Sequence, residues 1–105
     1  MLGAGATGVI AYNDLMAIGT IEGLAGSGVE VPREVSVVGV DDTIAGRVNR
    51  PKLTSIAMPT QEAGRSAVDL LLHAIDLPAG RSAAKTTLET SLVIRESTAP
   101  PPDLK

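Results

Sequence analysis

The chain has 105 residues, a net charge of −3 and no cysteine, which suits one domain and excludes disulfides, thiolate metal sites and cysteine nucleophiles. Its Lys and Arg residues are dispersed rather than gathered in a basic stripe, so these residues are not expected to bind DNA directly. With one Tyr and no Phe or Trp, the core must be built from Val, Ile, Leu and Ala, which pack well in parallel strands against helices.

The first predicted strand and helix meet at a polar turn. Val9–Tyr12 is predicted to be a short buried strand, and Asn13 is placed to cap the helix that follows. Asp14 then lies in the first turn, where the helix dipole favours a negative charge. The helix is expected to end near Ala25 or Gly26, because the Gly-Ser-Gly sequence at 26–28 supplies a stop.

This first helix carries two apolar stripes. The stripe expected to face the sheet consists of Ala17, Ile21 and Leu24. The second stripe flanks Glu22 and consists of Leu15, Ile18 and Ala25. It fits either a wide core-facing surface or a face that binds a partner, and the pattern alone does not choose between them.

Two more strands and a second helix follow. Val35–Val40 is β-branched and almost continuously apolar, which predicts a buried strand ending at two aspartates. A polar loop is expected to run from there through Arg50, before a third strand at Leu53–Ala57. Thr60 is placed to cap a helix from about 61 to 75 with an apolar stripe along one side.

The last third of the chain has weaker signals. One or two strands are predicted between Thr87 and Arg95, and the proline-rich tail at 99–105 is expected to be extended or disordered. The only histidine, His73, lies in the second helix, where a solvent-facing role is favoured over a metal ligand or catalytic base. No metal site or cofactor is predicted.

Asn13 and Asp41 are the candidate ligand-binding residues. They follow two strands about one βαβ unit apart, so the strands should be parallel and both residues should emerge at one sheet edge. Small ligands bind at that edge in open α/β sheets, and both side chains can hydrogen-bond sugar-like hydroxyls. The simpler role of Asn13 is the helix cap alone, and capping or loop structure accounts for Asp42.

Two patterns in the sequence resemble enzyme sites but are not interpreted as such. The glycines of residues 3–8 match G-x-G-x-x-G, but a strand follows them and none precedes them, the reverse of a dinucleotide site. Asp41 and Asp42 could form a catalytic pair, yet no base, nucleophile or metal partner is recognisable for them. The chain is therefore predicted not to be an enzyme, with no catalytic residues.

An ordered set of short motifs covers residues 7–98. They are Asn13-Asp14-x-Met16-Ala17-x-Gly19, Gly28-x-x-Val31-Pro32, Val35-Ser36-Val37-Val38-Gly39-x-Asp41-Asp42, Pro51-x-Leu53-Thr54-Ser55 and Leu92-Val93-x-Arg95-x-Ser97-Thr98. In this order they closely resemble the C-terminal part of LacI/GalR-type bacterial transcription regulators. One departure is Val40, where the family usually has an aromatic residue.

The resemblance implies a partial periplasmic-binding-protein-like lobe, an α/β fold with a mostly parallel sheet flanked by helices. It implies that Asn13 and Asp41 face a sugar or other small effector. It also favours the partner-binding reading of the second helix stripe, and the expected homodimer surface consists of Leu15, Ile18, Glu22 and Arg47. Closure of two such lobes over the effector would change the geometry of a DNA-binding head.

The resemblance further predicts a single incomplete effector domain. Its expected parts are a C-terminal-lobe βαβ region at 1–58, a helix and connection at 59–85 that normally crosses to the other lobe, final strands at 86–98 and a tail. A truncated cleft should bind effector weakly, and DNA contact is expected only through a missing N-terminal helix-turn-helix. The helix at 61–75 is predicted to dock on the local sheet or on another copy.

Two other readings stay open beside the regulator. A fragment of a periplasmic sugar-binding protein would share the fold but should carry a secretion signal, and none is recognisable. A small α/β enzyme is disfavoured by the missing catalytic partners. No segment has the length and apolar character of a membrane span, so the chain is expected to be cytoplasmic.

Overall fold

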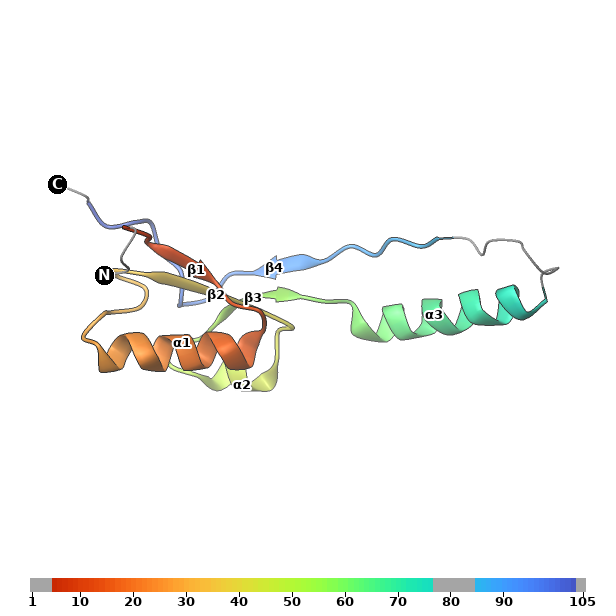
Figure 1. Cartoon of the computed structure of the whole chain (residues 1–105), viewed down its shortest axis with the longest axis horizontal. Coiled ribbons are helices and arrows are strands. Elements are labelled where there is room, and N and C mark those ends of the chain that lie inside the picture. Colours follow the sequence, from red (N-terminus) through yellow and green to blue (C-terminus); the bar gives the residue numbers. More distant parts are fainter. Residues whose placement is uncertain (1–4, 77–84, 104–105) are drawn as a thin grey trace. The chain divides into compact units, whose positions relative to one another are not determined.

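The structure is a computed structural model, and it describes residues 5–76 and 85–103. Within these residues one mixed sheet has the strand order β1-β2-β3-β4 (Figure 1). The strands are β1 (Gly8–Ile10), β2 (Ser36–Val40), β3 (Thr54–Ala57) and β4 (Ser91–Val93). β1, β2 and β3 are parallel and β4 is antiparallel, which confirms the predicted α/β fold with a mostly parallel sheet.

Within the described residues, 5–58 and 91–103 form one compact unit, and 59–76 and 85–90 belong to another. In the part of the chain that the structure describes, the first unit contains the whole sheet and two helices, and the second contains one helix. The assignment of the parts to one incomplete effector domain stays a prediction. None of the helices within residues 5–76 and 85–103 is long and apolar enough to cross a membrane.

The first helix, α1 (Asp14–Gly26), begins and ends where its sequence predicts. The Asn13 side chain accepts a hydrogen bond of 2.9 Å from the Met16 backbone N–H, so the predicted N-cap is confirmed. Gly28, two residues past the end, has φ +79°, a left-handed conformation that glycine adopts without the cost of a Cβ.

A short second helix, α2 (Ile44–Val48), lies in the segment predicted to be a polar loop, so that prediction is wrong. The Thr43 side chain caps it by accepting a hydrogen bond of 3.3 Å from the Gly46 N–H. The Thr43 N–H and hydroxyl are themselves held by the Asp14 carboxyl group. Asp14 lies 29 positions before Thr43, so local sequence patterns could not predict that it would hold the start of this helix.

The third helix, α3 (Thr60–Ile75), forms the predicted amphipathic helix of the second unit. Thr60 lies inside the helix rather than capping it, because Pro59 occupies the N-cap and makes no side-chain hydrogen bond there. The ring of Pro59 holds φ at −77°, and the Pro59 carbonyl accepts the first helical hydrogen bond. The docking of this helix stays a prediction.

The core lies between the sheet and α1 (Figure 1). Ala17 and Ile21 are buried and Leu24 packs against the core, which confirms the sheet-facing stripe. The other buried apolar side chains are Ala11, Val29, Val35, Val37 and Leu53. Alternation along the strands puts Ile10 and Leu92 on the opposite face of the sheet, where they are 74% and 57% exposed.

Candidate functional site

Polar side chains gather where β1 and β2 end. Asp41 directly follows β2, and Asn13 lies three residues after β1. Because these two strands are parallel and adjacent, both residues leave the sheet at its carboxyl edge. Backbone hydrogen bonds continue past the strand ends, from the Ala11 N–H to Val38 and from the Asp41 N–H to Ile56. The edge is therefore ordered up to the candidate residues.

Asp14 has no exposed surface, and its carboxyl group accepts three hydrogen bonds. The Ser55 hydroxyl donates to Oδ1 at 2.7 Å, while the Thr43 N–H and hydroxyl donate to Oδ2 at 2.6 and 2.8 Å. These bonds join α1 to β3 and to the start of α2. Asp14 is thus used by the fold and is not available to a ligand.

Two glycines make room for the Asp14 carboxyl group. A Cβ added at Gly39 would lie 2.3 Å from Asp14 Oδ1 and 2.8 Å from the Leu53 side chain. One added at Gly46 would lie 3.0 Å from Asp14 Oδ2 and 3.1 Å from the same leucine. The buried Asp14 side chain therefore requires glycine at both positions, one in β2 and one in α2.

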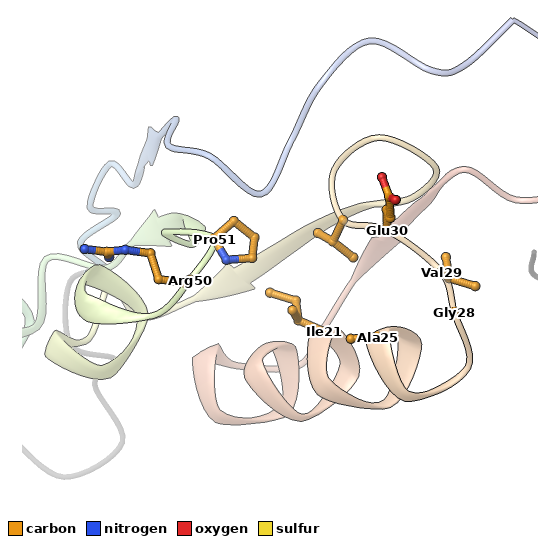
Figure 2. A pocket seen from close by; sticks show the side chains of 8 residues that line it. Ile21, Ala25, Gly28, Val29, Glu30, Arg50 and Pro51 are labelled. Carbon is orange, nitrogen blue, oxygen red and sulfur yellow. The ribbon is translucent and has the colours of Figure 1, made fainter.

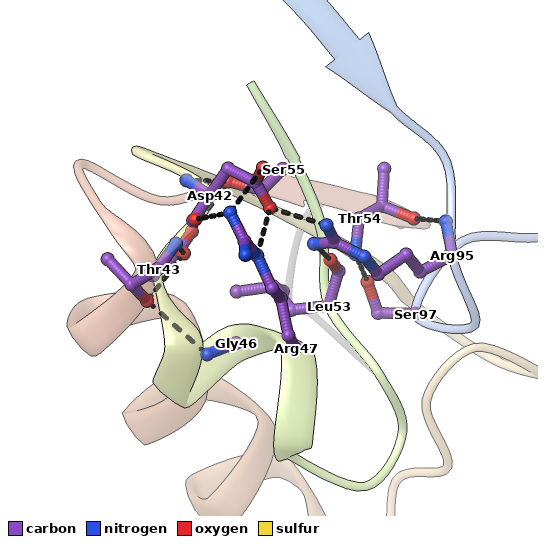
Figure 3. A network of polar contacts seen from close by, with 10 residues as sticks. Asp42, Thr43, Gly46, Arg47, Leu53, Thr54, Ser55, Arg95 and Ser97 are labelled. Carbon is purple, nitrogen blue, oxygen red and sulfur yellow. Dashed lines mark hydrogen bonds and ion pairs between the residues drawn. The ribbon is translucent and has the colours of Figure 1, made fainter. Parts of the chain in front are cut away.

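Asp42 is held by two arginines (Figure 3). Arg47 donates to both carboxylate oxygens at 3.3 and 3.1 Å, and Arg95 donates to Oδ1. The hydrogen bonds from Arg47, and then those from Arg95, lower the pKa of the Asp42 carboxyl below its ordinary value. The interpretation of Asp42 as structural is confirmed, but through ion pairs and not through a helix cap.

The segment after β4 ties the sheet together, and sequence reasoning gave it no structural role. The Ser97 hydroxyl donates to the Val37 carbonyl at 2.6 Å and accepts from the Thr54 N–H at 2.8 Å. The Thr54 hydroxyl in turn accepts from the Arg95 N–H and contacts the Thr98 hydroxyl. The only sequence signal for these contacts is the motif shared with the regulators.

Asp41 contrasts with its neighbour because its side chain is exposed and makes no hydrogen bond within the described part of the chain. Its φ is +106° and that of Asp42 is +51°, conformations that residues with a Cβ rarely adopt. Each such residue costs about 1–3 kcal/mol and persists only where its surroundings enforce it. The half-buried Asn13 side chain caps α1 through Oδ1. Its Nδ2 makes no hydrogen bond among the described residues.

The predicted dimer residues occupy mixed environments on α1 and α2. Leu15 and Glu22 are exposed on α1, whereas Ile18 is half-buried and packs against the core. The Arg47 side chain is 53% exposed while bonded to Asp42. The second stripe of α1 therefore divides between core packing at Ile18 and an open apolar side chain at Leu15.

An open pocket of about 430 Å³ lies at the other end of α1 (Figure 2). Its lining is mostly apolar, with one acidic and one basic residue, and consists of Ile21, Ala25, Gly28, Val29, Glu30, Val31, Arg50 and Pro51. These residues precede β2 and β3, so the pocket is away from the carboxyl edge that holds Asn13 and Asp41. It was not predicted from the sequence.

Metal and acid-base chemistry have few candidate groups here. Among residues 5–76 and 85–103, no three His, Asp or Glu side chains are grouped so that they could hold a metal ion. His73 is exposed on α3, and its Nδ1 lies 2.7 Å from the Asp69 carbonyl of the preceding turn. The solvent-facing position predicted for this histidine is confirmed.

A family model described as periplasmic binding protein-like domain matches residues 3–98. The chain belongs to this family. The transcriptional regulator MalR of Streptomyces coelicolor is 37% identical over 103 residues, which are 97% of this chain and 29% of the regulator.

Solved structures of LacI-type regulators are similar to this periplasmic-binding-protein-like domain. A LacI family transcriptional regulator from Arthrobacter sp. FB24, in complex with lactose, is 40% identical with a TM-score of 0.75, covering 92% of this chain and 36% of that one. A lac repressor dimer bound to operator is 35% identical with a TM-score of 0.78, covering 88% and 32%.

These matches confirm the resemblance to LacI/GalR-type regulators, which are transcription factors and not enzymes. The chain spans about a third or less of the length of the regulators quoted, at 29%, 36% and 32%.

Proposed function

We propose that this chain contributes one wall of an effector site and a self-association surface to a LacI/GalR-type transcription regulator. The observation that carries the proposal is the pairing of Asn13 and Asp41 at the carboxyl edge of adjacent parallel strands. This is the edge where open α/β sheets bind small ligands. The Asp41 carboxylate, which has no hydrogen-bond partner among the described residues, and the Asn13 Nδ2 offer an acceptor and a donor for hydroxyl groups.

A sugar is the effector class that fits these groups, and one regulator with a similar structure is a complex with lactose. A charge-assisted hydrogen bond contributes about 1.5–3 kcal/mol, so loss of the Asp41 contact should weaken binding about tenfold or more. The matched region is 36% of the lactose-bound regulator, so we infer that other parts of such a regulator supply the rest of the cleft. Binding by the chain alone should therefore be weak.

The test is a titration of the ¹⁵N-labelled chain with lactose, cellobiose and maltose, followed by amide chemical shifts. Shifts should concentrate at Asn13 and Asp41 for at least one sugar, and Asp41→Asn should reduce them. Shifts confined to Val29 and Val31 would place the ligand in the pocket of Figure 2 and overturn the assignment. Absence of any shift with all three sugars would also reject it.

The proposed self-association surface consists of Leu15, Ile18, Glu22 and Arg47, of which Leu15 is the most exposed apolar member at 69%. A similar solved repressor is described as a dimer bound to operator. We expect sedimentation to show concentration-dependent dimers, and Leu15→Glu to convert them to monomers. Ile94→Glu is the matched control, since Ile94 is 73% exposed and lies outside α1, α2 and α3. A monomer at all concentrations would contradict this part.

The proposal gives the chain no catalytic step and no direct DNA contact. Its net charge is −3, and phosphate recognition requires clustered Lys and Arg. In the regulator, DNA binding would belong to a helix-turn-helix outside residues 1–105.

A further inference from the structure

The Arg95 guanidinium joins the strand end of β2 to the start of β3. Its Nη2 donates to Asp42 Oδ1, and its Nη1 donates to the Leu53 carbonyl at 2.8 Å. Both side chains of the ion pair are only 16% exposed, so water screens the pair weakly. Figure 3 shows the guanidinium reaching across to the turn that holds Asp42.

The segment that carries Arg95 is itself locked in place. The Arg95 N–H donates to the Thr54 hydroxyl at 2.9 Å, and Ser97 bridges the Val37 carbonyl and the Thr54 N–H. Each of these contacts joins residues at least 40 positions apart in sequence, since the separations are 41, 60 and 43. The backbone of Arg95 is thus fixed on the sheet, and its side chain extends from there to the turn at Asp41 and Asp42.

The turn at Asp41 and Asp42 needs contacts that hold its unusual backbone conformation. Both residues have positive φ, and the backbone is held on each side of Asp41, by the bond from its N–H to Ile56 and by that from the Asp42 N–H to Ser55 at 3.0 Å. The remaining anchors are the Asp42 carboxylate, which is bonded to both arginines, and the Asp42 carbonyl, which accepts from Arg47 Nη2 at 3.0 Å. The Asp41 side chain alone is left free of the described contacts.

We propose that Arg95, acting through Asp42, is a positioning residue that holds Asp41 in the backbone conformation from which its carboxylate meets an effector hydroxyl. The role of Asp41 in this statement rests on the proposed function. Arg95 does not touch the effector, and the motif Arg95-x-Ser97-Thr98 is the clamp of the strand end.

Arg47 is a second anchor of Asp42, with hydrogen bonds to both carboxylate oxygens and to the backbone carbonyl. It is 53% exposed and lies in the short helix α2, whereas Arg95 is fixed on the sheet by its own backbone and by Leu53. Removal of Arg95 should therefore loosen the turn more than removal of Arg47. If the two arginines acted only through their positive charge near Asp42, their removal should loosen the turn equally.

The test is amide hydrogen exchange of the full chain by NMR, without sugar. In Arg95→Gln, exchange at Asp41 and Asp42 should rise by about tenfold more than at Ile21 in α1, because local opening of the turn spares the core. Arg47→Gln should give a smaller rise. Arg33→Gln is the matched control, since Arg33 also forms an ion pair, with Glu30, but on the exposed surface; it should leave the turn unchanged.

Arg95→Lys keeps the positive charge but loses the planar fork, so the rise should be about threefold and intermediate. This variant also provides the test if Arg95→Gln does not fold. Equal rises at Ile21 and Asp41 would show a purely global effect and overturn the proposal, as would an unchanged turn in both variants. Since no sugar is present, failure of lactose binding would reject the proposed function and not the clamp.

Discussion

Asp14 and Asp42 form an inner pair and Asn13 and Asp41 an outer pair, and each turn at the carboxyl edge contributes one residue to both. The inner residues are bonded within the fold, Asp14 by neutral donors of Ser and Thr and Asp42 by guanidinium groups. The outer residues keep polar atoms free of described partners. Adjacent positions at a strand end point in different directions, so one short motif serves both structure and binding.

The two inner residues represent two ways of placing an acidic side chain inside a small fold. Asp14 is fully buried and surrounded by hydrogen-bond donors from α2 and β3, a solution that depends on close packing around Gly39. Asp42 keeps partial access to water and relies on charge. The first should therefore be sensitive to added volume and the second to pH.

The largest effect is expected from Gly39→Ala, which drives a methyl group into the Asp14 carboxyl group. We expect the free energy of unfolding to fall by at least about 3 kcal/mol, from overpacking together with a disrupted buried hydrogen bond. Urea denaturation measures it. Gly19→Ala is the control, because a Cβ at Gly19 meets nothing within 4 Å; it should raise stability by about 0.5–1 kcal/mol. Equal effects at both sites would refute the packing account.

A smaller effect is expected from Asp42→Asn, which should lower the free energy of unfolding near neutral pH by about 1.5–3 kcal/mol. The folded state lowers the pKa of Asp42 below its ordinary 3.8, so the ion pairs stabilise fully above that value and progressively less as pH falls through the folded pKa. The difference between wild type and variant, measured by urea denaturation from pH 7 to pH 2, should therefore shrink below about pH 4. A difference independent of pH would show that the charge of Asp42 is not what stabilises the turn.

The smallest effect is expected from Asp41→Gly in the outer pair. Glycine adopts positive φ without a Cβ penalty, so the free energy of unfolding should rise by about 1 kcal/mol while the sugar-induced shifts disappear. Asp41→Asn is the control that keeps the Cβ, and its stability should stay within about 0.5 kcal/mol of wild type. A loss of stability in Asp41→Gly would mean that the carboxylate has a structural partner, and would remove the contrast between the two pairs.

The sequence by itself determined the elements whose signals are local. The β-branched run before Asp41 predicted β2, the cap at Asn13 predicted the start of α1, and the spacing of polar residues after two strands predicted a shared sheet edge. These features depend on hydrophobic periodicity and on neighbours within one helical turn, which single-sequence patterns record. The family was indicated separately, by the resemblance of the ordered motifs over residues 7–98.

Only the tertiary structure decided which polar residues the fold uses. The burial of Asp14, the helix α2 in place of a loop and the reach of Arg95 to Asp42 all depend on contacts between residues 29 to 53 positions apart. Periodicity and capping rules do not extend that far, because such contacts exist only once the sheet has brought the segments together. Packing and ion pairs therefore hold the Asp14 and Asp42 carboxyl groups within the fold, while Asp41 lies exposed at the edge.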